Sequence, residues 1–282
     1  MPIPATDLAL EAAEIFRGTQ KKLSALPGVC QSESLQEGYP VSSVKVTTAE
    51  AARIIGKPEG HYITIDLQPY FQRKPHFFPR AVRCLAAQLR ALLPATCGSI
   101  LAVGLGNQSM TADAVGPLTL EHLLVTRHLL AQDSPFAGLR STSALAPGVL
   151  SETGMEAWEL IRGALLCAQP DALLVIDALA AHSPNRLCTC LQLSDTGLIP
   201  GSGVGNHRLP INRETTGIPV IALGLPTVIR AETLIRTEDH TLFVTPRDID
   251  QRVRELSRLL GYGINLALQP SLTLEDISGL LG

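Results

Sequence analysis

Aromatic residues, long apolar stretches and an excess of charge of either sign are all missing from this sequence. Phe, Trp and Tyr make up only 4% of the 282 residues, so we expect an aliphatic core. No apolar run reaches the roughly 18 residues that a membrane-spanning helix needs, so no membrane partner is predicted. The net charge of −3 provides no overall positive field, which argues against direct nucleic-acid binding.

The first residues also lack the basic and then apolar pattern of a secretory signal, and an acid follows as early as Asp7. The six cysteines include no Cys-x-x-Cys pair. We therefore interpret them as buried free thiols of a cytoplasmic protein. In the alternative, Cys188 and Cys190 share one face of a strand and form a metal or redox pair.

Several catalytic signatures are missing as well. No Lys-Ser or Lys-Thr follows the glycine-rich segment 200–206, so it is not a phosphate-binding loop, although its backbone can approach a substrate closely. No serine lies in a Gly-x-Ser-x-Gly context, which disfavours a serine nucleophile. Asp195, Thr196 and Gly197 spell the signature of pepsin-like proteases, but that signature acts in an all-β fold. We interpret Asp195 as a strand-end or turn residue close to the site.

From residue 97 onward the sequence contains uninterrupted apolar strands that alternate with helical patterns. Such alternation is typical of a parallel sheet covered by helices on both faces. We predict a single α/β domain, a three-layer α/β/α sandwich with a mostly parallel sheet. The predicted strands are 100–103, 172–176, 189–193 and 220–223, and the predicted helices are 114–130, 155–167, 231–236 and 249–266.

The residues before this region predict an N-terminal addition to the sandwich. Residues 8–16 carry the apolar spacing of an amphipathic helix. Segments 41–48 and 61–67 alternate between apolar and polar residues, which indicates antiparallel strands at the edge of the sheet. A short helix between them is expected to stop at Gly56, and another helix is expected over residues 81–93.

Two acids follow apolar strands and are the strongest candidates for chemistry. Asp113 follows strand 100–103 through a Gly-Leu-Gly-Asn turn, and Asp177 directly follows strand 172–176. The carboxyl edge of a parallel sheet is where sites collect. Taken alone, Asp113 fits a helix N-cap and Asp177 fits a partner for a helix N-terminus. Together they predict a pair in which one carboxyl holds a proton while the other activates water, as amide hydrolysis requires.

Other polar residues near the predicted strand ends have less specific interpretations. His182 and His207 lie in loops, where they would complete a metal site with the acids, although a lone loop histidine is more commonly solvated. Arg186, Arg213 and Arg230 are candidates for binding an acidic side chain of a substrate.

The chain resembles the germination proteases of spore-forming bacteria in six stretches: GLGNQSMTADAVGP, VTRHLL, PGVLSETGMEAWELIRG, VIDALA, SDTGLIPGSGVGN and IPVIALGLPTVI. The resemblance implies an atypical aspartic-type endopeptidase whose two essential aspartates are Asp113 and Asp177, without a cofactor. It implies a fold similar to that of hydrogenase-maturation proteases, and a homotetramer. It also implies that the protein degrades small acid-soluble spore proteins during germination, in the cytoplasm of the forespore and spore core.

The resemblance further implies a zymogen that removes its own propeptide by cutting after an acidic residue. The sequence TDLA at residues 6–9 matches the expected cleavage sequence, so the cut is expected between Asp7 and Leu8. Residues 1–7 are then the propeptide and residues 8–282 the single peptidase domain. This lead is shorter than we expect of the family.

Loop residues around the two aspartates are predicted to line the substrate cleft, namely Gly104, Asn107, Asp195, Gly203, Asn206 and Thr227. Ala112 stands where the family leads us to expect a proline, and we expect it to loosen the loop before Asp113. Two alternatives remain open. One is a metal-dependent peptidase of the hydrogenase-maturation type, and the other is a non-catalytic binding protein on the same scaffold.

Overall fold

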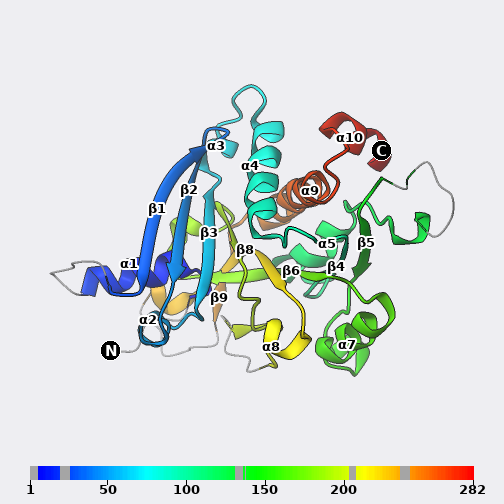
Figure 1. Ribbon diagram of the computed structural model, residues 1–282. Coiled ribbons are helices and arrows are strands. Elements are labelled where there is room, and N and C mark those ends of the chain that lie inside the picture. The colour runs from blue at the N-terminus through cyan, green and yellow to red at the C-terminus, as the bar shows by residue number, and fades with distance from the viewer. Residues whose placement is uncertain (1–5, 20–25, 131–135, 137, 203–207, 236–241) are drawn as a thin grey trace.

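The computed structural model describes residues 6–19, 26–130, 136, 138–202, 208–235 and 242–282. Nine strands of this part of the chain form one sheet in the spatial order β1-β2-β3-β7-β8-β6-β4-β5, with β9 paired to β8 (Figure 1). The strands are β1 Val29–Gln36, β2 Tyr39–Val46, β3 Gly60–Asp66, β4 Ser99–Gly104, β5 Ser141–Leu145, β6 Ala172–Ala181, β7 Cys190–Ser194, β8 Val220–Arg230 and β9 Phe243–Val244.

One half of the sheet is parallel, because β4 pairs in parallel with β5 and β6, and β6 pairs in parallel with β8. The predicted α/β class with a parallel sheet is therefore confirmed. The other half is antiparallel, with β1, β2 and β3 added at the edge as the alternating segments predict. β7 runs antiparallel to β8. Its connection to β6, residues 182–189, is too short for the crossover that a parallel return needs.

Helices cover both faces of the sheet, as the three-layer prediction requires (Figure 1). On one face, α4, α5, α9 and α10 pack with even-numbered residues of β4 and β6, such as Leu174 and Ile176. On the other face, α7 packs with odd-numbered residues such as Leu173 and Val175, while α1 and α2 cover β2 and β3. The helices are α1 Ala9–Thr19, α2 Ala49–Ile55, α3 Gln68–Phe71, α4 Phe77–Leu92, α5 Val115–Leu120, α6 Leu150–Thr153, α7 Ala157–Ala168, α8 Arg213–Thr216, α9 Ile249–Leu268 and α10 Leu274–Leu281.

Local signals set the ends of several helices. The Thr48 hydroxyl accepts from the N–H of Ala51 at 3.2 Å and caps α2. Gly56 ends this helix with a left-handed φ of 70°, so the predicted stop is confirmed. At the start of α10, Thr273 and Asp276 form a reciprocal capping box.

The predicted helix over residues 114–130 is too long. Only α5 and a 3-10 turn at Arg127–Leu129 form there. Between them, the N–H of Leu124 donates to Oδ1 of Asn265 on α9 at 2.8 Å. In an unbroken helix, the N–H of Leu124 would donate to a backbone carbonyl of the preceding turn. Here it donates to the Asn265 side chain instead, so the helix does not continue.

Other differences have similarly local causes. Segment 231–236 forms a 3-10 turn at Ala231–Thr233, and residue 236 lies outside the described residues. The sequence patterns did not predict β1, β5 or α10. β1 exposes six consecutive side chains, so it lacks the alternation of buried and exposed residues that marks a half-buried strand.

The cysteines are all free, and four of them are buried as predicted: Cys84, Cys97, Cys188 and Cys190. The prediction is wrong for Cys30 and Cys167, which are exposed on β1 and α7. Cys188 precedes β7 and has a positive φ of 53°, so the expected arrangement of Cys188 and Cys190 along one strand is also wrong. Among the described residues, no helix has the length and apolarity needed to cross a membrane.

Candidate active site

Asp113 lies in a tight loop that leads from the end of β4 into α5. Gly106 in this loop has a φ of 111°, and a Cβ there would lie 1.8 Å from the carbonyl oxygen of Asp113, so the loop requires glycine. The N–H of Asn107 donates to Oδ2 of Asp113 at 2.8 Å. Asp113 is part of a 3-10 turn, and Ala114 occupies the N-cap position of α5, so the N-cap interpretation is wrong.

Asp177 lies inside β6 rather than at its end, because the strand continues to Ala181. Its side chain is 7% exposed, and its Oδ1 accepts from the N–H of Ala178 at 2.9 Å rather than from a helix N-terminus. Asp177 is in register with Gly224 of β8, which is in register with Gln192 of β7. Side chains of residues paired in this way point to the same face of the sheet. Asp177 and Gln192 therefore flank Gly224, and the Leu179 side chain covers this glycine, because a Cβ there would lie 2.4 Å from Leu179 Cγ.

The surroundings of both aspartates favour their protonated forms. Burial raises the pKa of Asp113, although the hydrogen bond from Asn107 and the charge of Arg208 oppose this shift. Burial raises the pKa of Asp177 well above its ordinary value, and the carboxylates of Asp113 and Asp7 raise it further. The pair therefore keeps a proton at a pH where isolated carboxyl groups are ionised.

Two cavities meet at Asp177. One has a volume of about 340 Å³ and is lined by Asp113, Asp177 and Arg208 among other residues. The second has a volume of about 450 Å³, and its lining includes Asp177 and Gln192. Asp7 lines both cavities, so the N-terminal segment crosses a cleft that the two aspartates share.

Polar contacts hold this N-terminal segment in the cleft. The N–H of Asp7 donates to the carbonyl oxygen of Ala180 at 2.9 Å. The Asp7 carboxylate accepts from the N–H of Ala180 at 2.8 Å and from the hydroxyl of Ser202 at 2.7 Å. Lys57 Nζ donates to the carbonyl oxygen of Thr6 at 2.8 Å, and burial lowers the pKa of this amine.

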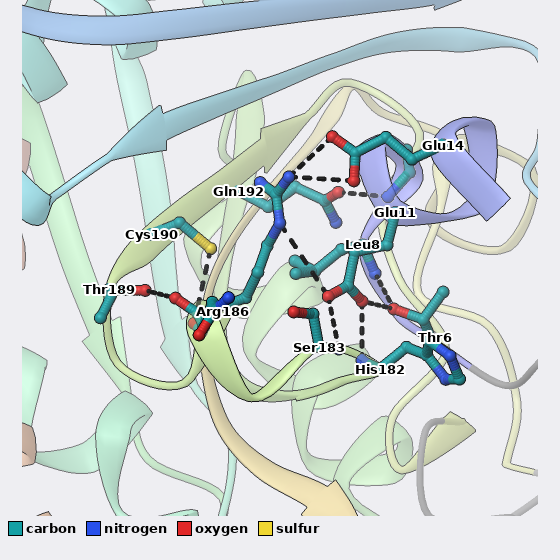
Figure 2. A network of polar contacts seen from close by, with 12 residues as sticks. Thr6, Leu8, Glu11, Glu14, His182, Ser183, Arg186, Thr189, Cys190 and Gln192 are labelled. Atoms are coloured by element: carbon teal, nitrogen blue, oxygen red, sulfur yellow. Dashed lines mark hydrogen bonds and ion pairs between the residues drawn. The ribbon is translucent and has the colours of Figure 1, made fainter. Parts of the chain in front are cut away.

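The residues that follow Asp7 are anchored more deeply (Figure 2). Glu11 is 2% exposed, and its carboxylate accepts from the Thr6 hydroxyl and from the N–H groups of His182 and Ser183, the latter two at 2.7 and 2.9 Å. Leu8 is fully buried in a cluster with residues of β6, β7 and β8. The segment beginning at Leu8 is therefore part of the folded domain, whereas Asp7 lies in the cleft.

The six predicted cleft residues have different positions. Thr227 lines the cavity next to Asp113, and its hydroxyl donates to the carbonyl oxygen of Ala112 at 2.6 Å. Gly104 lies outside both cavities because it packs against α5, where a Cβ would lie 2.5 Å from the backbone of Gly116. Gly203 and Asn206 lie outside the described residues.

The two remaining residues predicted for the cleft, Asn107 and Asp195, lie outside the two cavities. Asn107 lies outside both cavities, because its N–H is directed to Asp113 and its side chain accepts from the N–H of Ser109. Asp195 lies just beyond β7 and accepts from the N–H of His61 at 2.8 Å. It therefore supports the pairing of β3 and β7 and lies outside both cavities.

Three arginines were expected near an acidic substrate side chain, but the contacts of Asp7 come from Ala180 and Ser202 instead. Arg186 pairs with Glu14, Arg230 lies against the ring of Phe243, and Arg213 belongs to α8. Within the described residues, no group of three or more His, Cys, Asp or Glu side chains is arranged to hold a metal ion. His207 lies outside them.

The sequence analysis missed Gln192, Ser202 and Lys57. A signal for Gln192 was present, because it is the single amide inside an otherwise apolar strand segment, CLQL. Ser202 lies in the glycine-rich segment that was expected to approach a substrate, and Gly201 and Ser202 do line the cleft. Lys57 follows the stop at Gly56, and nothing local distinguishes it from a solvated lysine.

Comparison with known proteins identifies the family. A family model described as germination protease matches residues 3–240. The germination protease of Caldanaerobacter subterraneus subsp. tengcongensis is 36% identical, over 98% of this chain and 97% of the relative. That of a Geobacillus species is 42% identical, over 96% of this chain and 76% of the relative. The chain belongs to the germination protease family. Its membership makes it a peptidase and confirms the resemblance seen in the sequence.

A germination protease of Clostridium perfringens is also 36% identical, over 98% of both chains. Among solved structures, a NiFe hydrogenase maturation protease, HycI, from Thermococcus kodakarensis is similar with a TM-score of 0.38 and 20% identity. It covers 63% of this chain and 98% of its own. Similarity at that level supports no argument about the site.

Proposed function

We propose that this chain is an aspartic-type endopeptidase that degrades small acid-soluble spore proteins during spore germination and cuts after an acidic residue. It is made as a zymogen that cuts itself between Asp7 and Leu8, with residues 1–7 as propeptide and residues 8–282 as the peptidase domain. One observation carries the proposal. The chain approaching the bond after Asp7 lies in the cleft that Asp113 and Asp177 line.

Asp113 and Asp177 act as an acid–base pair that shares one proton. The ionised carboxylate takes a proton from water as the water oxygen bonds to the scissile carbonyl carbon. The protonated carboxyl gives its proton to the leaving nitrogen when the C–N bond breaks. One carboxyl gains a proton and the other loses one, so the pair ends with a single proton again. The raised pKa values of both groups support this role, because they keep a proton on the pair at a pH where isolated carboxyl groups are ionised.

Preference for an acidic residue before the cut is supported by the contacts of Asp7. Its carboxylate accepts hydrogen bonds from the backbone N–H of Ala180 and the hydroxyl of Ser202. Hydrogen bonds to an ionised acceptor are stronger than those between neutral groups. An acidic residue of a spore protein would make the same two contacts when it replaces Asp7 in the cleft.

The proposal for assembly and location is based on the family resemblance alone. We propose a homotetramer in the cytoplasm of the forespore and spore core, acting without a cofactor. The net charge of −3 gives the chain no general attraction to DNA, so its substrates are spore proteins that have left DNA.

The test is cleavage of a purified small acid-soluble spore protein, with fragments identified by mass. The wild type should cut after an acidic residue, and Asp113→Asn and Asp177→Asn should lose at least 10³-fold in rate while remaining folded. Asp171→Asn is the matched control, because Asp171 is an exposed acid that accepts from Gly98 and Ser99, away from the cleft. An unchanged rate in either active-site variant contradicts the proposal. Loss of wild-type activity with a chelator supports the metal-dependent alternative.

A further inference from the structure

Gln192 contacts the chain on both sides of the Asp7–Leu8 bond. Its Nε2 donates to the carbonyl oxygen of Asp7 at 2.9 Å, and its Oε1 accepts from the N–H of Ala9 at 2.7 Å. That carbonyl belongs to the bond expected to be cut. The side chain is 8% exposed, so water does not compete freely for these contacts.

The two contacts fix the orientation of the Gln192 amide. A carbonyl oxygen accepts only and a backbone N–H donates only, so a flipped amide would lose both hydrogen bonds. The N–H of Ala9 thereby directs Nε2 toward the Asp7 oxygen. Because Ala9 belongs to the folded domain, the protein itself orients this donor.

The sheet places this donor two strands away from Asp177. Gln192 and Asp177 are both in register with Gly224, which lies between them. Strands are about 4.8 Å apart, so the two backbones are separated by roughly 10 Å. Asp7 reaches across this part of the sheet, because its carbonyl oxygen contacts Gln192 and its carboxylate accepts from the N–H of Ala180 on β6, and both cavities that Asp7 lines are also lined by Asp177.

We propose that Gln192 is the catalytic hydrogen-bond donor that polarises the scissile carbonyl, opposite the water-activating aspartates. The inference rests on the proposed function and adds a catalytic residue to it. When water attacks, the carbonyl π electrons move onto oxygen, and the N–H of Gln192 stabilises the resulting negative charge. No bond to Gln192 forms or breaks. A fixed donor about 2.7–3.1 Å from such an oxygen contributes about 10²–10³-fold to kcat.

The opposing interpretation is a structural glutamine that only anchors the N-terminal segment. The experiment uses the purified full-length chain and measures the first-order rate of appearance of the Leu8 N-terminus. It then measures kcat and KM of the processed protein on a peptide with the sequence of residues 3–14. Gln192→Met keeps the length of the side chain but removes the donor. We expect it to slow self-cleavage and kcat by about 10²–10³-fold, with KM changed by less than about tenfold.

Gln269→Met is the matched control. Gln269 is 1% exposed, and it also binds backbone groups through both ends of its amide, at the N–H and carbonyl oxygen of Arg140, at 2.8 and 3.0 Å. Its replacement should lower stability and leave kcat within about threefold of wild type. A similar loss of kcat in this control shows that the effect of Gln192→Met is a general loss of packing, and overturns the proposal.

Gln192→Glu keeps the test decisive if the methionine variant does not fold. A neutral carboxylic acid can donate to the carbonyl oxygen, whereas its ionised form cannot. The charged or titratable groups around the same cavity are Asp7, Lys57, Tyr62 and Asp177, and wild type and variant share them. The ratio of variant kcat to wild-type kcat should therefore rise as the pH falls from 8 to 5. A flat ratio overturns the proposal.

Two outcomes distinguish failure of the proposed peptidase function from failure of the proposed role of Gln192. If the wild type makes no cut at Asp7–Leu8 and none in the peptide, the proposed function fails, and the role of Gln192 fails with it. If the wild type cuts and Gln192→Met cuts as fast, or loses only KM, the function stands and the inference is wrong.

Discussion

At the scale of single residues, the surroundings of Asp177 disfavour the ionised form of its carboxyl group. It is buried in the middle of a strand, and both Asp113 and Asp7 repel its charge. Burying an ionised carboxyl costs free energy that the rest of the fold must offset, and the charge of Arg208 opposes this penalty only in part. Under the proposed function, Asp177 serves chemistry at the expense of stability.

Asp177→Asn should therefore raise stability while it removes activity. Because the folded-state pKa is raised, the folded protein carries no penalty well below the ordinary carboxyl pKa of about 4. The penalty grows as the pH rises through that value toward the folded-state pKa. We expect Tm at pH 7 to rise by at least about 2–4 °C, the shift for each kcal/mol at this size. Calorimetry at pH 4, 5.5 and 7 should show the gain shrink as the pH falls.

Asp171→Asn tests a carboxylate whose ionised form stabilises the folded state, the opposite of Asp177. The Asp171 carboxylate accepts from the N–H groups of Gly98 and Ser99 and from the Ser99 hydroxyl, and these bonds lower its pKa. The ionised form therefore stabilises the folded state above the ordinary carboxyl pKa. Its replacement should lower Tm at pH 7, with little effect below pH 3. A gain in Tm for both variants, or for neither, contradicts the electrostatic argument.

Asp7→Ala tests how the acidic residue before the cut is recognised. The change removes two hydrogen bonds, from Ala180 and Ser202, to an ionised group. Each such bond is worth about 1.5–3 kcal/mol, so self-cleavage should slow by about 10- to 100-fold or more. Glu14→Ala removes another acid from the same segment, one paired with Arg186 outside the cleft, and should have no effect. Equal processing of both variants would rule out recognition through Asp7.

Sequence reasoning located the two aspartates because each follows an apolar strand. It did not locate Gln192, Ser202 or Lys57, because their roles depend on which strands become neighbours. Gln192 and Asp177 are 15 positions apart in the chain, yet they face one glycine because β8 inserts between β6 and β7. Three arginines were candidates for binding an acidic side chain, whereas the Asp7 carboxylate accepts from a backbone N–H and a hydroxyl.

At the scale of elements, the loop from β4 to α5 decides where Asp113 lies. Gly106→Ala should disrupt it, because a Cβ there would lie 1.8 Å from the carbonyl oxygen of Asp113 at a φ of 111°. We expect self-cleavage to fall by more than 10²-fold, since catalytic geometry tolerates little displacement. Gly154→Ala is the control, because Gly154 also has a positive φ but a Cβ there meets nothing within 4 Å. Gly154→Ala should lower the free energy of unfolding by about 1 kcal/mol and leave the rate of self-cleavage unchanged.

Helices and strands were predictable where the pattern of apolar residues alone determined them. The apolar strands of the parallel half, and α7 and α9 beside them, follow directly from burial on both faces and from helical spacing. The direction of β7 was not predictable from its own residues, because it depends on the short connection from β6. The end of α5 depends on Asn265, a side chain 141 positions away that binds the N–H of Leu124.

At the scale of the whole molecule, the N-terminal segment has two parts, one packed in the core and one lying in the cleft. From Leu8 onward the segment is part of the core, and Glu11 ties it to the loop after β6. Asp7 occupies the cleft beside the aspartates. A cut after Asp7 would free the cleft and leave the domain intact. Removal of seven residues should therefore change Tm little while opening the site to substrates.

The most direct test of this proposal is the intact mass of the purified full-length chain, followed over time under conditions that permit self-cleavage. We predict that the wild type loses residues 1–7 and gains an N-terminus at Leu8 at a rate that does not depend on protein concentration. Asp113→Asn and Asp177→Asn should keep their full mass. Cleavage of either variant at the wild-type rate, or a wild-type N-terminus elsewhere than Leu8, would contradict it.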